Sequence, residues 1–286
     1  MQIGTILFKL KNDTFIWRLG IALIITCLSC SGAFALDPMG PPTTGLMEGQ
    51  FELGIDYSNS TMDLELTNGK YSEWNHITSE LDTGEAESFT LNDFETNKIY
   101  ANLGYGIWEY CDVFLRLGLV NAEFGDSIWE AGEEFDHQTD FTFCIGSRAT
   151  FYEDGNLQLG RMIQLSWANL DGVLKAPQWT EDESSDIEVF EFQAAVGPTI
   201  TLENGTLIYG GPFIHFVDGD IKEKFNDVNY KGEDISAKYT WDIEESSIFG
   251  GYIGAQMTFG EYTFFNVEYQ YTSGADLFGL SLIYRF

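Results

Sequence analysis

The histidines are the first candidates for catalysis, because imidazole can act as a general base near neutral pH. The chain has 3 of them, His76, His137 and His215. His215 precedes Asp218 in the stretch HFVDGD, which is a candidate His–Asp pair. No serine motif, phosphate-binding loop or Cys/His metal spacing accompanies that pair. We therefore expect no catalytic residues and no cofactor, and a hydrolase built on His215 and Asp218 is the alternative.

Three acidic clusters offer the oxygen ligands that divalent cations prefer. They are Glu133-Glu134-Asp136, Glu181-Asp182-Glu183 and Asp218-Gly219-Asp220. None of them has the spacing of a calcium-binding loop. A solvated acidic surface explains such clusters more simply. We predict no specific metal site, and divalent cations held at these clusters remain an alternative.

The net charge excludes one class of partner. The chain has 14 Lys and Arg residues against 45 Asp and Glu residues, for a formal charge of −31. Binding to nucleic acid requires a basic surface that neutralises phosphates. We therefore expect no nucleic-acid partner.

The N-terminus has the layout of a secretory leader. Lys9, Lys11 and Arg18 precede an apolar run that ends in Ala33-Phe34-Ala35. A basic start, a short apolar stretch and an A-x-A ending are typical of a cleavable signal peptide. We assign residues 1–35 to the signal peptide and residues 36–48 to an N-terminal periplasmic segment. An uncleaved anchor is the alternative, but the apolar run is short for a membrane span.

Residues 49–286 alternate between apolar and polar positions, which is the period of a β-strand. The stretch GQFELGIDY places Phe51, Leu53, Ile55 and Tyr57 on one face. Stretches of this kind predict ten strands, near residues 49–57, 97–107, 112–120, 141–151, 157–167, 189–202, 207–217, 248–259, 263–272 and 277–286. Met62–Leu66 also alternates and could add a hairpin, so the count could lie between eight and twelve.

The connections between these stretches alternate in length. Short turns fall near residues 108–111, 153–156, 203–206 and 260–261, and long polar segments fall near residues 58–96, 125–140, 170–186 and 218–246. Most of the acidic residues lie in the long segments. Every second connection then lies on the same side, as in an up-and-down antiparallel meander. We predict long acidic loops on that side.

The distribution of charge favours a barrel in lipid over a soluble barrel. The polar faces of the strands carry mainly Gly, Ser, Gln and Asn, and few charges. Aromatic residues fall near strand ends, as expected for rings at the two membrane interfaces. We predict an all-β fold, a closed antiparallel up-and-down transmembrane β-barrel of about ten strands over residues 49–286.

The few charges on the polar faces would lie in the lumen. Arg116 and Arg148 fall on adjacent strands at similar height, and Glu268 falls roughly across the barrel. A buried arginine requires a counter-charge, so we predict an Arg116/Arg148–Glu268 network. Arg285 and Glu52 lie on the strands that close the barrel and form a second predicted pair. Such a network either plugs the barrel or makes a constriction selective for charge.

The chain ends in LFGLSLIYRF, where every second residue is apolar, with an aromatic residue in last place. These positions are Phe278, Leu280, Leu282, Tyr284 and Phe286. The stretch resembles the C-terminal signal of bacterial outer-membrane β-barrel proteins, among them the small porin-like and opacity-like barrels. The resemblance implies a place in the cell outer membrane, contact with its lipid, and recognition of these residues by the barrel assembly machinery.

The expected role is structural, or the passage of a limited set of small solutes. A surface module that recognises partners or cations through its acidic loops is one alternative. A hydrolase at the barrel rim is the other. The sequence names no solute or ligand.

Membrane fractions test the barrel interpretation directly. A folded barrel keeps its ring in detergent and unfolds on boiling, so we expect the protein to migrate differently on a gel before and after heating. The measurement is a heat-modifiability gel. Unchanged migration, together with a protein soluble in the periplasm, would contradict the fold.

Overall fold

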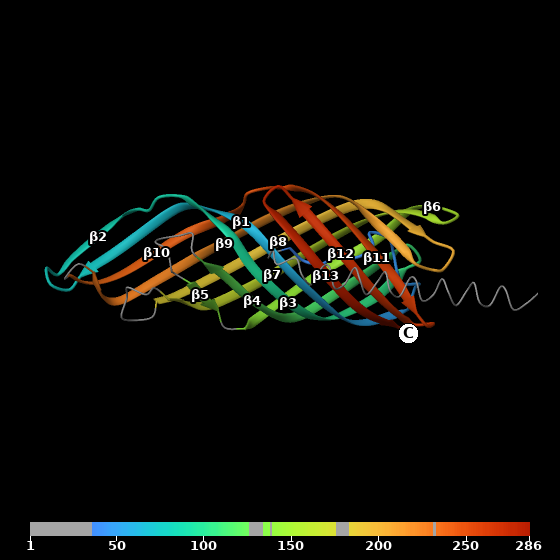
Figure 1. Ribbon diagram of the computed structural model, residues 1–286, viewed down its shortest axis with the longest axis horizontal. Helices are drawn as coiled ribbons and strands as arrows, with labels where there is room; N and C mark the ends of the chain where they lie inside the picture. Colours follow the sequence, from blue (N-terminus) through green and yellow to red (C-terminus); the bar gives the residue numbers. More distant parts are fainter. Residues whose placement is uncertain (1–35, 126–133, 138, 176–182, 231–232) are drawn as a thin grey trace, which may run out of the picture. The chain divides into compact units, whose positions relative to one another are not determined.

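The structure is a computed structural model that describes residues 36–125, 134–137, 139–175, 183–230 and 233–286. Almost all of these residues from Phe51 onward belong to one antiparallel sheet (Figure 1). No helix in these ranges is long and apolar enough to span a membrane. The strands are β1 (Phe51–Asn75), β2 (Glu80–Glu85), β3 (Phe89–Trp108), β4 (Cys111–Gly125), β5 (Glu134–His137), β6 (Asp140–Asp154), β7 (Leu157–Lys175), β8 (Glu183–Thr201), β9 (Leu207–Tyr230), β10 (Glu233–Glu245), β11 (Phe249–Phe259), β12 (Thr263–Thr272) and β13 (Ala275–Arg285).

Ten of the strands close into a ring. The order is β1, β3, β4, β6, β7, β8, β9, β11, β12 and β13, and β13 pairs with β1 again. Every neighbouring pair in this ring is antiparallel. The predicted all-β, up-and-down closed barrel is therefore confirmed.

Short turns join the strands at one end of the ring, which we call the turn end. At the other end several strands continue, and we call this part the extension. There β10 pairs with both β1 and β9, β5 pairs with β4 and β7, and β2 pairs with β1 (Figure 1). The prediction of long loops was wrong over much of this region. Residues 58–75 and 218–230, for example, are strand, because their backbones pair with neighbouring strands of the sheet.

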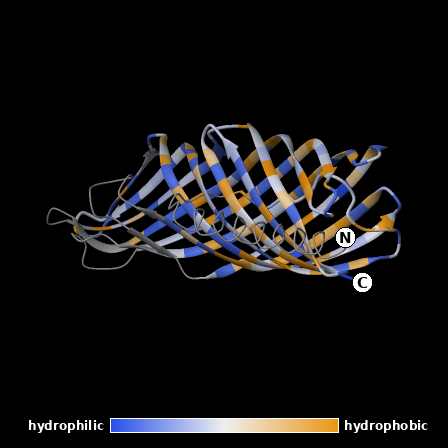
Figure 2. Ribbon diagram, turned by 45° about the vertical axis from the view of Figure 1, so that its right-hand side comes forward, coloured by the Kyte–Doolittle hydropathy of each residue, from blue (hydrophilic) through white to orange (hydrophobic). Residues whose placement is uncertain are grey.

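Within the ring the two faces of each strand are as predicted. On β1 the outward side chains Phe51, Leu53 and Ile55 are exposed, and the inward Glu52 and Asp56 are buried. Figure 2 shows this alternation of hydrophobic and hydrophilic residues along the strands. On β13 the outward positions are Phe278, Leu280, Leu282 and Tyr284, and Phe286 follows them as an exposed residue. Apolar side chains thus cover most of the outside of the ring, and many polar side chains lie inside it.

The pattern inverts along the same strand in the extension. Beyond Tyr57, the inward residues of β1 become Met62 and Leu64, and both are 2% exposed. The outward residues become polar, as at Asp63 and Glu65. An apolar interior with a polar exterior is the arrangement of a barrel in water. The inversion therefore marks where the membrane-facing ring ends.

An aromatic cluster fills part of the extension. The Tyr239 and Trp241 rings stack with centroids 5.6 Å apart, and Phe89 meets Trp241 edge-on at the same centroid distance. Trp241 is 2% exposed, and its indole nitrogen donates to the Glu87 carbonyl oxygen. Burial of large rings stabilises the extension independently of lipid.

Substitutions on the two faces of β1 test the inversion. Leu64→Ala removes a buried side chain, and we expect it to lower the free energy of unfolding by about 2–5 kcal/mol. Glu65→Ala is the matched control on the outward face and should change it by less than about 0.5 kcal/mol. The measurement is the urea midpoint followed by fluorescence. Equal effects of the two changes would contradict the water-facing arrangement.

Candidate functional site

The lumen of the ring contains the start of the described chain. Residues 36–46, which we call the lumenal segment, lie inside the barrel. Leu36, Asp37 and Met39 are 0% exposed, and Leu46 is 2% exposed. The sequence predicts a periplasmic segment over residues 36–48, whereas the structure places most of these residues in the lumen. The sequence DPMGPP has no strand pattern, so its backbone groups need partners other than a neighbouring strand.

Carboxylates of the barrel wall supply some of these partners. Glu268 accepts hydrogen bonds from the amides of Met39 at 2.8 Å and Gly40 at 2.7 Å, one at each carboxylate oxygen. Asp112 Oδ2 accepts from the Gly45 amide at 2.7 Å. Hydrogen bonds to ionised groups are stronger than those between neutral groups. These contacts tie the segment to β12 and β4.

Donors of the wall bind the segment's carbonyl oxygens. Arg116 Nη1 donates to the Pro38 carbonyl oxygen at 2.7 Å, and Gln270 Nε2 donates to the Asp37 carbonyl oxygen at 2.7 Å. The wall also makes room for the segment. A Cβ atom at Gly160 would lie 2.5 Å from the Pro42 carbonyl oxygen, so only glycine allows this close approach.

The lumenal arginines do not meet the carboxylate that we predicted. Arg116 Nε lies 2.7 Å from Asp56 Oδ2. Arg148 lies 2.8 Å from Glu52 Oε1 through Nη2, and 2.7 Å from Asp112 Oδ1 through Nε. Carboxylates on nearby strands thus neutralise both arginines. The predicted contact with Glu268 is not formed, since the lumenal segment occupies that carboxylate.

Arg285 and Glu52 are brought together at the seam between β1 and β13. Their residues are directly paired in the sheet, and Arg285 Nε lies 3.2 Å from Glu52 Oε2. The Arg285 guanidinium also lies over the Phe264 ring, 4.1 Å from its centroid. The sequence interpretation missed several inward aromatic residues, and Phe114 is one that meets an arginine. Phe114 points inward under Arg116, whose guanidinium is 4.5 Å from the ring centroid, and such contacts stabilise a buried cation.

A second charged layer lies further from the turn end. Lys98 Nζ is 3.1 Å from Asp37 Oδ1 and 2.8 Å from Glu191 Oε1. His215 Nε2 lies 3.4 Å from Glu191 Oε2. The proposed partner of His215, Asp218, is on the outward face of β9, whereas His215 is 1% exposed in the lumen. An offset of three residues along one strand places two side chains on opposite faces, so this spacing separates the proposed pair.

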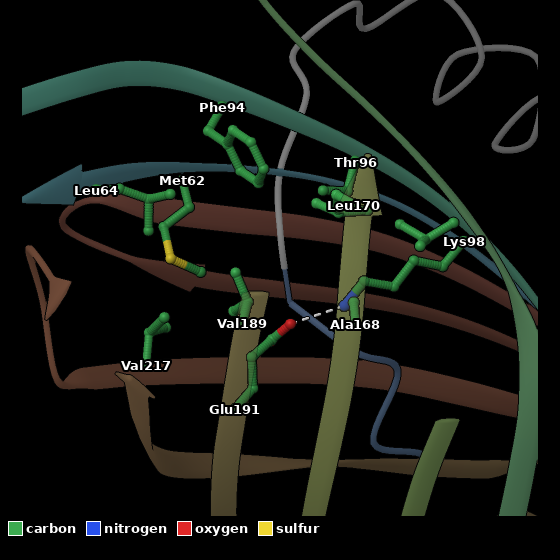
Figure 3. Close-up of a pocket in the computed structure, with 11 residues that line it drawn as sticks. Met62, Leu64, Phe94, Thr96, Lys98, Ala168, Leu170, Val189, Glu191 and Val217 are labelled. Carbon is green, nitrogen blue, oxygen red and sulfur yellow. Dashed lines mark hydrogen bonds and ion pairs between the residues drawn. The ribbon is translucent and has the colours of Figure 1, made fainter. Parts of the chain in front are cut away.

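Apolar side chains close over this layer. Figure 3 shows Met62, Phe94, Val189 and Val217 gathered beside the Lys98–Glu191 pair. The cavity between them is about 10 Å³, which is about the size of one water molecule. A wider recess of about 210 Å³ lies at the turn end, where Leu46 and Met47 face Glu109 and Glu153.

The environment of the barrel follows from its outer surface. The ring has no free edge, and most of its outward side chains are apolar, with exposed fractions of 51% for Leu53 and 52% for Leu282. Exposed aromatic residues occur near both ends of the apolar band, among them Tyr57, Tyr105, Phe249 and Tyr284. A closed antiparallel barrel with such a band is the form in which β-strands cross an outer membrane. The chain is an outer-membrane β-barrel.

Several solved structures with a similar arrangement are bacterial outer-membrane proteins. One is the outer membrane protease OmpT from Escherichia coli, with 10% identity and a TM-score of 0.45. The match covers 88% of this chain and 99% of the OmpT chain. OprG from Pseudomonas aeruginosa has 9% identity and a TM-score of 0.42, covering 85% and 98%. The COG4313 outer membrane channel from Pseudomonas putida F1 has 12% identity and a TM-score of 0.41, covering 88% and 100%. No family model and no curated protein matches the chain. Similarity at this level carries no information on activity.

Two groups of chemically reactive residues remain, the cysteines and the acidic clusters. Cys111 and Cys144, which differ in height on their strands, are both free thiols, and Cys144 is buried. Of the acidic clusters, residues 133 and 181–182 lie outside the described residues, and Asp220 pairs with Lys222. Within the described ranges, no group of three or more His, Cys, Asp or Glu side chains could hold a metal ion. Cation binding at the acidic clusters stays a prediction.

Removing one charge tests the lumenal network. Arg116→Met leaves Asp56 buried without its cation, and we expect a loss of about 3–5 kcal/mol in the free energy of unfolding. Adding Asp56→Asn in the same chain should recover part of that loss. Arg161→Met is the matched control, because Arg161 is exposed on the outward face. Urea midpoints measure all three, and an effect of Arg116→Met no larger than the control would contradict the network.

Proposed function

We propose that this protein is a closed outer-membrane barrel with a structural role. Passage of small solutes is limited to states in which residues 36–46 have left the lumen. The observation that carries this proposal is the lumenal segment itself. Its backbone is bound from several sides, by Glu268 and Gln270 on β12, Asp112 and Arg116 on β4, and Gln164 on β7. Such a segment has to exchange many charge-assisted hydrogen bonds for water before it can move.

The orientation follows from the chain ends. The C-terminus and the short turns share the turn end, which we assign to the periplasm, and the extension then projects from the cell surface. The outward residues of β13 would contact outer-membrane lipid and serve as the signal read by the barrel assembly machinery. Both partners are inferred from the apolar outward face and its terminal aromatic residue, Phe286.

We propose no catalytic role. The candidate catalytic pair of the sequence analysis, His215 and Asp218, is split between the two faces of β9. His215 instead lies against Glu191 in the charged layer. If His215→Ala abolished a hydrolysis reproducibly measured with the purified barrel, this part of the proposal would fail.

Recognition at the cell surface is a second candidate. The extension has its own apolar core, so it can hold a defined shape in water. Its outward positions on neighbouring strands carry carboxylates, for example Glu65 on β1 and Glu244 on β10, whose backbones are paired in the sheet. A rigid acidic surface suits basic or cationic partners.

Planar-bilayer recordings test the closed barrel. We expect the purified protein to give no ion steps, because the lumenal segment and the apolar layer fill the ring. A variant lacking residues 36–44 should conduct, or conduct far more often. Glu268→Ala, which removes the acceptor for two segment amides, should give brief openings.

Two controls keep the test decisive. Met47→Ser alters an exposed residue just outside the segment and should stay silent. Heat-modifiable migration shows that each variant is folded. Steady conductance of the unaltered protein would overturn the closed barrel. A folded deletion variant that remains silent would overturn the role of the lumenal segment in closing it.

A further inference from the structure

The lumenal segment runs in a definite direction through the barrel. Near the turn end, the Gly45 amide binds Asp112, which directly follows the turn between β3 and β4. Deeper in, Asp37 meets Lys98, far along β3 from that turn. Followed toward its N-terminus, the chain therefore leads away from the turn end and reaches the charged layer at Leu36 and Asp37.

The described part of the charged layer holds two carboxylates and one lysine, with His215 beside Glu191. Asp37 and Glu191 are both buried, and among the described residues Lys98 is the only Lys or Arg that forms an ion pair with them. Lys98 reaches only one oxygen of Asp37. The other oxygen, Oδ2, is buried and has no hydrogen-bond partner among the described residues. A buried carboxylate with an unsatisfied oxygen is costly, so the site calls for another donor, preferably a charged one.

The sequence supplies such a donor at this place. Hydrolysis after Ala35 adds water across the Ala35–Leu36 amide and breaks its C–N bond. The leader departs with a carboxylate on Ala35, and Leu36 keeps the nitrogen as an α-ammonium group. A leader peptidase is the class of enzyme that performs this step, and the small residues of Ala33-Phe34-Ala35 suit it. Leu36 is 0% exposed and directly precedes Asp37.

We propose that the mature chain begins at Leu36, and that its α-ammonium group is buried in the lumen as the second cation of the Asp37–Lys98–Glu191 layer. Removal of the leader then precedes entry of the segment. An attached leader starts from the inner membrane, on the turn-end side, while Leu36 sits deep in the lumen. The chain would have to double back through a lumen that its own residues 37–46 already fill.

This inference rests on the plugged lumen proposed above, and amine labelling tests it separately. Protein purified from outer membranes is analysed by intact mass, and is then treated with an amine-reactive ester before or after heat unfolding. We expect the mass of a chain that starts at Leu36. We also expect the Leu36 amine to be unlabelled in the folded barrel and labelled after unfolding.

Lysines provide internal controls in the same sample. Lys222 and Lys224, whose side chains are 40% and 46% exposed, should label in both states. Lys98, at 2% exposed, should label only after unfolding. A mature chain with another first residue would overturn the inference, as would a Leu36 amine that labels in the folded barrel as readily as Lys222. Ion conductance by a barrel whose Leu36 amine is protected would contradict the closed channel alone.

Discussion

Closure of the ring is the constraint on which the rest of the molecule depends, because lipid cannot hydrogen-bond to an open strand edge. The first and last strands meet at the β1–β13 seam, where the Phe51 amide donates to the Phe286 carbonyl oxygen and the Phe286 amide donates to Phe51, each at 3.0 Å. Glu52 stands opposite Arg285 in this register. A slip by one residue would turn Leu53 and Ile55 inward and Glu52 into lipid. The seam therefore sets which side chains face lipid and which face the lumen.

Along one strand, the polarity of the inward and outward side chains changes with the surrounding solvent. Where lipid surrounds the ring, the inward side chains are polar, as at Glu52 and Asp56. Where water surrounds the extension, the inward side chains are apolar, as at Met62 and Leu64. The polarity changes near the level where the ten-stranded ring ends. There β11 and the β12–β13 hairpin end, and β10 pairs with β1 beyond them. A single pleated strand such as β1 thus contributes to a membrane barrel and to a soluble core.

Polar inward side chains create a problem that the lumenal segment solves. A ring of ten strands leaves a space that charged side chains of the wall do not fill alone. Residues 36–46 fill it with backbone amides and carbonyl oxygens, which serve both carboxylates and guanidinium groups. The segment and the wall satisfy each other's polar groups, and the buried Leu36 and Met39 side chains add apolar packing to these hydrogen bonds. At the charged layer this arrangement gives way to the apolar interior of the extension.

The alternation of residues such as Phe51, Leu53 and Ile55 was sufficient to predict the ring, its strand count and its faces, because lipid imposes a simple period on the sequence. The last strand and the Glu52–Arg285 pairing could also be predicted, because both follow from the order of the strands. The sequence did not reveal that residues 58–75 and 218–230 continue as strands, since a polar outward face resembles a loop in composition. It also did not reveal that Asp37 to Gly45 would enter the lumen, or that Asp56 and Asp112 would be the partners of Arg116 and Arg148. Those contacts depend on distances between strands remote in sequence, and only the closed barrel determines them.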